Sequence, residues 1–129
     1  MIDLNWYQTL NHPPLTPPSW IFLPTWVTLY TMILISLIIF AVKKTENPKL
    51  LGYILFFVQL VLNHTWTQIF FGMHNVFWAL VIIITLDISV FCNIRENFFI
   101  SKKSAYFLIP YFVWILFATY LNAGILVLN

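Results

Sequence analysis

Four long apolar runs, separated by short polar segments, dominate this 129-residue sequence. They cover about residues 20–42, 50–71, 76–92 and 105–128, and the third run is the shortest. A helix crosses the roughly 30 Å hydrocarbon core of a bilayer in about 20 residues. Unpaired backbone groups are costly in lipid, and the runs lack the alternating pattern of a barrel strand, so each run should be a helix. We therefore predict an all-α integral membrane bundle with four transmembrane helices.

The composition favours a membrane protein over a soluble one. Hydrophobic residues make up 61% of the chain and charged residues 8%, whereas a typical globular domain has about 25% charged residues. The length leaves room for one domain, residues 1–129, in which residues 1–19 precede the first span. The net charge of +2 is small, so no nucleic-acid partner is expected.

The basic residues indicate an orientation. They occur in the connections at 43–49 and 95–103, which should therefore share one side of the membrane. The other side receives both termini and the turn at 72–75. In an inner membrane, the positive-inside rule places the two basic connections in the cytoplasm and both termini on the opposite side. The basic residues are Lys43, Lys44, Lys49, Arg95, Lys102 and Lys103.

The second run carries polar side chains at membrane depth. Gln59, Asn63 and Thr67 follow one another at i, i+4 spacing, and Trp66 lies beside them. Polar groups at this depth normally face other helices or a cavity, because lipid offers them no hydrogen-bond partner. We expect Gln59 to join helices and Asn63 to face a pocket.

The fourth run carries a comparable stripe of Trp114, Ala118 and Asn122, which combines a large ring, a small side chain and an amide. By periodicity alone, such a stripe is more typical of a helix interface, because small residues let helices approach each other. The second and fourth runs nevertheless each bring an amide and an indole to the interior. That combination suits a cavity for an aromatic ligand with a few polar edges.

The segment before the first span is rich in proline and contains Trp6, Tyr7 and Trp20. Two interpretations fit this pattern. The aromatic side chains could anchor the chain in the headgroup region, as aromatic belts do. Alternatively, the segment is a stiff lid that holds rings over a cavity mouth at little entropic cost.

The ionisable residues indicate no conventional catalytic centre. A charged carboxylate within a span is costly, so Asp87 should face inward or lie near the cytoplasmic interface, and we favour an interfacial acid that is compensated by Arg95 or Lys102. The three histidines show no recognisable ligand spacing, so no metal site is predicted. No motif of a hydrolase or of a nucleotide-binding enzyme is present.

Three ordered groups of residues resemble the motifs of one membrane-protein family. The first group is Trp6, Tyr7, Leu10, Pro13, Pro17, Pro18, Trp20, Phe22, Pro24, Trp26, Leu29 and Tyr30. The second is Gln59-Leu60-Val61-Leu62-Asn63, Trp66, Phe70-Phe71-Gly72 and Trp78-Ala79-Leu80. The third is Pro110-Tyr111, Trp114, Phe117-Ala118-Thr119 and Leu121-Asn122. In order and spacing they are similar to the motifs of the TspO/translocator family of tryptophan-rich proteins, also called peripheral benzodiazepine receptors.

The resemblance implies a helical bundle, often dimeric, whose pocket binds porphyrins, sterols or benzodiazepine-type compounds. The expected partners are a tetrapyrrole such as protoporphyrin IX or haem, membrane lipid and a second copy of the chain, with no intrinsic cofactor. Bacterial relatives are linked to light- and oxygen-dependent porphyrin breakdown. By motif position, Trp26 and Trp114 match the two tryptophans of that photochemistry, and Asn63 matches the pocket amide. Family members usually have five spans, and the span that would precede Trp6 is expected to be missing.

The expected function is therefore the binding of a porphyrin-type ligand by a sensor, a regulator or a light-dependent porphyrin degrader. One alternative is a small-metabolite transporter or channel lined by Gln59, Asn63, His64 and Asp87. Another is a regulatory membrane subunit with no ligand of its own. The predicted ligand-binding residues are Trp6, Tyr7, Trp20, Trp26, Tyr30, Gln59, Asn63, Trp66, Trp114, Ala118 and Asn122.

Overall fold

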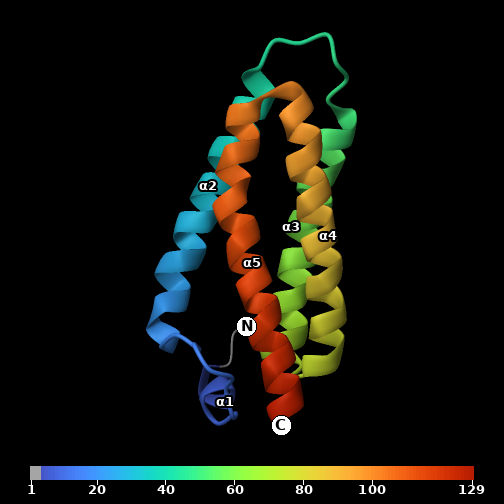
Figure 1. Cartoon of the computed structure of the whole chain (residues 1–129). Coiled ribbons are helices and arrows are strands. Elements are labelled where there is room, and N and C mark those ends of the chain that lie inside the picture. Colours follow the sequence, from blue (N-terminus) through green and yellow to red (C-terminus); the bar gives the residue numbers. More distant parts are fainter. Residues whose placement is uncertain (1–3) are drawn as a thin grey trace.

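The computed structural model describes residues 4–129, and this part of the chain is a bundle of long helices (Figure 1). The long helices are α2 (Phe22–Val42), α3 (Leu50–Thr67), α4 (Val76–Ile100) and α5 (Lys102–Leu128), and a π-helix, η2 (Gln68–Gly72), continues α3. A short helix, α1 (Leu4–Gln8), and a 3-10 turn, η1 (Ser19–Ile21), precede α2. Within residues 4–129, four helices are long and apolar enough to cross a membrane, which confirms the predicted all-α, four-span fold.

The connections place the basic residues at one end of the bundle. Helix α5 packs against both α2 and α4, and α3 packs against α4. The 43–49 connection lies at one end, whereas α1 and the C-terminus lie at the other (Figure 1). The side-chain amide of Asn47 donates a hydrogen bond of 3.4 Å to the carbonyl of Phe99, which ties this connection to the end of α4. The end that carries the basic residues is therefore opposite to the end that carries α1.

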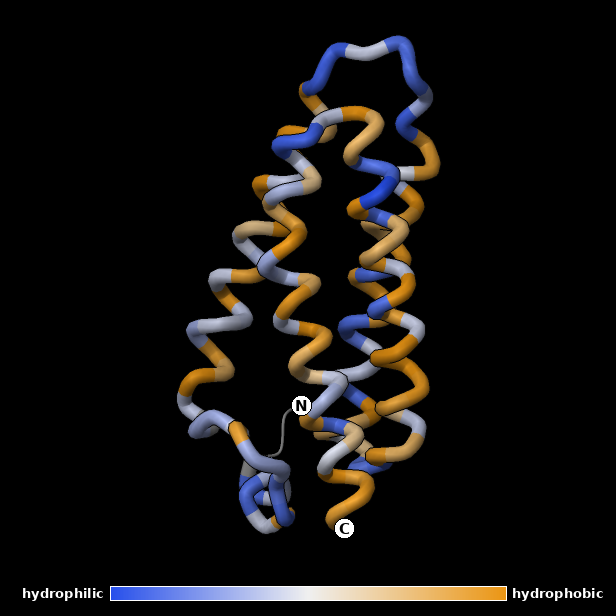
Figure 2. Tube along the Cα trace, viewed as in Figure 1, coloured by the Kyte–Doolittle hydropathy of each residue, from blue (hydrophilic) through white to orange (hydrophobic). Residues whose placement is uncertain are grey.

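The outer faces of the helices are apolar. Figure 2 shows hydrophobic residues along all the long helices and a concentration of hydrophilic residues in the 43–49 connection and around α1. Large apolar side chains such as Phe57, Phe99 and Val113 are exposed on the outside. Extensive apolar exposure of this kind is stable in lipid and not in water. The chain is thus an integral, multi-pass membrane protein.

The third span is longer than the sequence predicted. Polar residues end its apolar run near residue 92, yet α4 continues to Ile100. It continues because Asn93 and Asn97 are fully buried inside the bundle, while Arg95 projects outward and is exposed. The prediction that this span is the shortest was therefore wrong. Asn93 and Asn97 end the apolar run in the sequence, but their side chains face the interior of the bundle and the helix continues past them.

The connection predicted at 95–103 is almost entirely helical. Arg95 lies within α4, and α5 begins at Lys102, directly after Ser101. The side chain of Ser101 accepts a hydrogen bond of 3.5 Å from the backbone N–H of Ser104 and caps the start of α5. A capped turn this short needs no polar loop, so the fourth helix starts before the predicted residue 105.

Candidate ligand-binding site

The π-helical segment η2 turns two adjacent phenylalanines toward the interior. Phe70 and Phe71 are only 2% and 6% exposed, and their ring centroids are 4.7 Å apart in an edge-to-face arrangement. In a regular α-helix, neighbouring side chains point about 100° apart. A π-helical turn holds an extra residue and is often found at functional sites. Here it provides two rings to one wall of a cavity.

A small apolar cavity lies between α2, the end of α3 and α5, and α1 contributes Tyr7 to it. Its volume is about 30 Å³. Aromatic and aliphatic side chains form nearly all of its wall. The lining consists of Tyr7, Phe22, Trp26, Trp66, Phe70, Phe71, Trp114, Ala118, Leu121, Asn122 and Ile125.

Trp26 is the ring at which α2, α3 and α5 meet. Its centroid lies 6.4 Å from that of Trp66 and 6.4 Å from that of Trp114, with the latter pair edge-to-face at 87°. Tyr30, one turn further along α2, lies 5.9 Å from the same ring. Centroid distances of about 4.5–7 Å are typical of favourable aromatic pairs. The two tryptophans predicted for photochemistry, Trp26 and Trp114, are therefore in direct contact.

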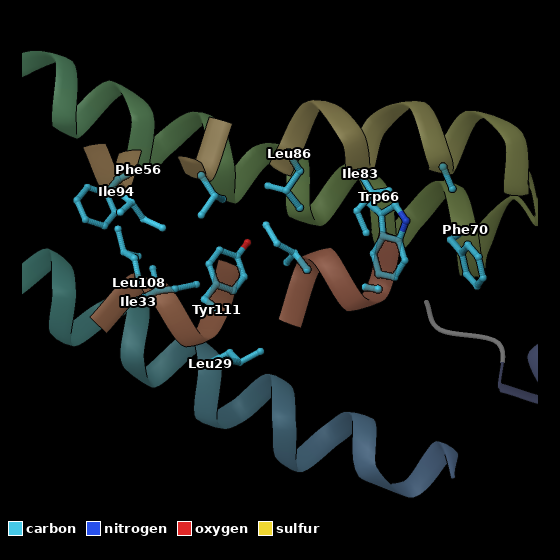
Figure 3. Packing of buried hydrophobic residues seen from close by; sticks show 14 of the residues in the cluster. Leu29, Ile33, Phe56, Trp66, Phe70, Ile83, Leu86, Ile94, Leu108 and Tyr111 are labelled. Carbon is cyan, nitrogen blue, oxygen red and sulfur yellow. The ribbon is translucent and has the colours of Figure 1, made fainter. Parts of the chain in front are cut away.

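Trp66 and Asn122 form the floor of the cavity together. The indole N–H of Trp66 donates a hydrogen bond of 2.9 Å to Oδ1 of Asn122, and Nδ2 of Asn122 donates one of 3.0 Å to the carbonyl of Val76. Figure 3 shows the indole of Trp66 near Phe70 at one end of the packed core. Because both ends of the amide are bonded, Asn122 fixes α3, α4 and α5 to one another at the floor of the site.

The other predicted polar residues form a separate network. The hydroxyl of Tyr30 donates to Oδ1 of Asn63 at 2.8 Å, Nδ2 of Asn63 donates to the hydroxyl of Tyr111 at 2.7 Å, and that hydroxyl donates to Oε1 of Gln59 at 3.0 Å. Gln59 joins helices, as the sequence predicted. Asn63 does not line the cavity, because both ends of its amide are bonded to tyrosines of α2 and α5. Tyr30 is 43% exposed and lies outside the lining, and its ring contacts Trp26, which belongs to the lining.

The N-terminal segment covers the cavity through Trp6 and Tyr7. Tyr7 is 4% exposed and lines the cavity. The ring of Trp6 stacks on that of His74, in the turn before α4, with centroids 4.3 Å apart. Trp20 is 73% exposed and is not part of the lining, so the structure does not bring it to the site. Residues 1–3 of the predicted lid lie outside the described residues.

Hydrogen bonds attach this segment to the end of α5. The backbone N–H of Asn11 donates to Oδ1 of Asn129 at 3.2 Å, and Nδ2 of Asn129 donates to the carbonyl of Asn11 at 2.9 Å. The hydroxyl of Tyr120 donates to the carbonyl of Pro14 at 2.7 Å. Exposed contacts of this kind break more easily than a packed core does. The N-terminal segment that covers the cavity is therefore attached to α5 by hydrogen bonds that can break and re-form easily.

Two hydrogen-bond donors in the lining have no partner among residues 4–129. They are the hydroxyl of Tyr7 and the indole N–H of Trp114, and both atoms are buried. Burial raises the pKa of Tyr7 from 10.0 to about 12, so its hydroxyl stays protonated at neutral pH. An unpaired buried donor is unfavourable by about 1–3 kcal/mol. Two residues of the cavity wall thus carry a buried donor that an acceptor on a ligand could satisfy.

In comparison with known proteins, the profile of the TspO/MBR family matches residues 2–128. The chain belongs to the TspO/MBR family. It is 43% identical over 124 residues to the tryptophan-rich protein TspO of Archaeoglobus fulgidus, covering 96% of this chain and 80% of that protein. It is 34% identical over 125 residues to the translocator protein of Homo sapiens, covering 92% and 72%. It is 33% identical over 125 residues to protein CrtK of Rhodobacter capsulatus, covering 96% and 78%.

Part of the lining of this TspO/MBR protein was missed from the sequence. Phe70 and Phe71 stand in a family motif, but the motif alone does not say that both rings face the cavity. Leu121 and Ile125 continue the stripe of Trp114 at helical spacing, so the period could have revealed them. The missed residues are Phe22, Phe70, Phe71, Leu121 and Ile125.

Asp87 has a different partner from the one predicted. Its Oδ2 accepts a hydrogen bond of 2.6 Å from the hydroxyl of Thr119 on α5. Asp87 is half-buried at this helix contact, whereas Arg95 and Lys102 are exposed. The favoured expectation of an interfacial acid compensated by those cations was wrong, and the alternative of an inward-facing side chain agrees with the hydrogen bond to α5.

Tyr111→Phe is expected to destabilise the bundle more than Tyr30→Phe. The first change removes a buried hydroxyl that bonds both Asn63 and Gln59, at a cost of about 1–3 kcal/mol for the groups left unpaired. The second removes one bond at a partly exposed ring. Thermal unfolding in detergent, followed by circular dichroism, measures both losses. Equal losses would mean that the network does not hold the helices together.

Proposed function

We propose that this TspO/MBR protein binds a flat, largely apolar ring ligand of the tetrapyrrole class, such as protoporphyrin IX, and acts as a membrane sensor or regulator. The observation that carries the proposal is the meeting of Trp26, Trp66 and Trp114 at one apolar cavity. Indole faces stack favourably on an extended macrocycle. A relative of Cereibacter sphaeroides bears the name tryptophan-rich sensory protein, which supports a sensing role.

The unpaired donors support a ligand with acceptor atoms. Tyr7 and Trp114 present an O–H and an N–H that have no partner among the described residues. A tetrapyrrole offers ring nitrogens and carboxylate oxygens as acceptors. Binding such a ligand would satisfy groups that are otherwise unpaired, which favours it over a pure hydrocarbon of the same shape.

The size of the cavity requires a change of shape on binding. Its volume is about 30 Å³, whereas ligand pockets are commonly about 300–1,000 Å³. The structure therefore corresponds to a closed form. Helix α1 is short, and the segment after it is held to α5 by exposed hydrogen bonds. We infer that this segment and the rings beneath it move when a ligand enters.

Light-dependent chemistry is a further part of the proposal. An excited tetrapyrrole is an oxidant, and an indole in van der Waals contact can give it one electron, so that the tryptophan is oxidised and the ligand reduced. Trp26 and Trp114 are the rings proposed for this step. Molecular oxygen would then take up the transferred electron by reacting with the reduced macrocycle, and the oxidised indole would lose its N–H proton to give a neutral radical.

Protoporphyrin IX is expected to quench tryptophan fluorescence saturably in detergent-purified protein kept in the dark. Trp26→Phe and Trp114→Phe should each weaken this binding several-fold, because a stacking partner is worth about 0.5–1.5 kcal/mol. Illumination in air should bleach the porphyrin faster with the wild type than with either variant. Trp78→Phe, at an exposed ring outside the lining, is the matched control. The absence of saturable binding in well-folded protein would contradict the proposal.

A transport path is a second candidate, favoured by a buried polar stripe on α4. Ser89, Asn93 and Asn97 follow i, i+4 spacing and are 9%, 0% and 0% exposed. The hydroxyl of Ser89 and both polar atoms of Asn93 have no partner within residues 4–129. Buried polar groups in membrane helices often mark a path for polar solutes. Solute flux into liposomes that is abolished by Asn93→Leu would favour this function over ligand sensing.

We also propose that the basic end of the bundle faces the cytoplasm and that the cavity end faces the opposite side, in accordance with the positive-inside rule. A cysteine introduced at Lys44, in a Cys92→Ser background, should then react with a membrane-impermeant maleimide only after cells are opened. A cysteine introduced at Asn11, near α1, should react in intact cells once the outer envelope is permeable. The reverse pattern would contradict this orientation.

A further inference from the structure

Tyr7 borders two hollows. The inner one is the aromatic cavity of about 30 Å³. The outer one is an open hollow of about 410 Å³ on the N-terminal segment, and Tyr7 belongs to both linings. The inner wall is almost wholly apolar, whereas the outer wall includes an imidazole, an amide and a hydroxyl. The outer hollow is lined by Tyr7, Gln8, His12, Thr16, Pro17 and Pro18.

The ring of Tyr7 is held between the hollows by ring contacts. Its centroid lies 4.6 Å from that of His12, 5.5 Å from that of Phe22 and 5.7 Å from that of Phe71. Its hydroxyl makes no hydrogen bond to any residue from 4 to 129. Rotation of the side chain would therefore exchange dispersion contacts without breaking a hydrogen bond, and such contacts are individually weak.

The outer hollow suits the polar edge of an amphipathic ring ligand. Its volume is within the range of about 300–1,000 Å³ that is common for ligand pockets. Nδ1 of His12 is buried and has no partner in the described part of the chain. The sequence from residue 4 to residue 20 contains no aspartate or glutamate. Rotation of the imidazole would bring this nitrogen to a carboxylate in the hollow, and no acidic side chain of the segment would oppose that carboxylate.

We propose that Tyr7 is the gate between the two hollows, and that an amphipathic ring ligand enters through the outer one. Its ring body passes Tyr7 into the aromatic cavity, and its carboxylate edge stays at His12. This inference rests on the proposed tetrapyrrole binding and adds to it the route and the recognition of the polar edge. By this route, the ligand does not need to pass between helices from the lipid to reach the aromatic cavity.

Stopped-flow tryptophan quenching by protoporphyrin IX tests the gate. Tyr7→Ala removes the ring, and the association and dissociation rate constants are each expected to rise about tenfold. Tyr7→Phe keeps the ring and should leave the association rate constant within about twofold of wild type, whereas loss of the hydroxyl donor should raise the dissociation rate constant. Tyr7→Trp should slow association. Trp78→Phe is the control. Association rate constants that are the same in all Tyr7 variants would overturn the gate.

A matched pair of ligands tests the outer site. Protoporphyrin IX and its dimethyl ester share one macrocycle, but the ester has no free carboxylate. His12→Ala is expected to weaken binding of the diacid about fivefold and to leave the ester unchanged. Equal weakening of both ligands would overturn the assignment of the carboxylate edge to His12.

These experiments distinguish failure of the proposed tetrapyrrole binding from failure of the proposed gate. If neither ligand binds to the wild type, the proposed tetrapyrrole function is wrong. If both ligands bind, but with rates independent of Tyr7 and affinities independent of His12, the function stands and the gated outer site is wrong.

Discussion

A bilayer offers no hydrogen-bond partner to a buried polar side chain, and this constraint organises the whole bundle. Tyr111 bonds Asn63 and Gln59 near the middle of the core, and Asn122 bonds Trp66 and the backbone of α4 at the cavity floor. These bonds fix the rotation of α3 and α5 about their axes. Once that rotation is set, the indoles of the two helices must point toward α2, where Trp26 lies between them.

The spans and much of the site could be predicted from the sequence, because both follow from length and helical period. Apolar length identified the crossing helices, and i, i+4 spacing placed Trp66, Trp114, Ala118 and Asn122 toward a common interior. The TspO/MBR motifs added Tyr7 and Trp26, which periodicity could not relate to the other helices. The match of the family profile over residues 2–128 agrees with those motifs.

Other features depend on contacts that a single sequence does not specify. Asn63 has the spacing of a pocket residue, but tyrosines on two other helices take up both ends of its amide. The end of α4 was misplaced because an inward-facing asparagine resembles a solvated one in composition. Phe70 and Phe71 lie in a π-helical turn, which the sequence period does not reveal. Trp20 is aromatic and proline-flanked like a lid residue, yet nothing in the sequence reveals that its ring is exposed.

Under the proposed tetrapyrrole function, this structure is the closed form of the protein. Hydrogen bonds of buried amides join the helices that form one part of the cavity wall. The part formed by Tyr7 is held by ring contacts, and the N-terminal segment is attached by exposed hydrogen bonds, which break more easily. A site of this kind would select a ligand in two ways: the apolar cavity contacts the ring faces, and the polar groups of the outer hollow contact the polar edge. The buried donors of Tyr7 and Trp114 make an acceptor-bearing ring a better occupant than a hydrocarbon.

The most direct test of the central claim is fluorine NMR of protein labelled with 5-fluorotryptophan and titrated with protoporphyrin IX in the dark. Single tryptophan-to-phenylalanine variants assign each resonance. Large, saturable shifts are predicted for Trp26, Trp66 and Trp114, which line the cavity, and small ones for Trp20 and Trp78, which are exposed. Shifts confined to the exposed pair, or spread evenly over all the tryptophans, would show that the ligand binds to the detergent-covered surface and would contradict an aromatic cavity site.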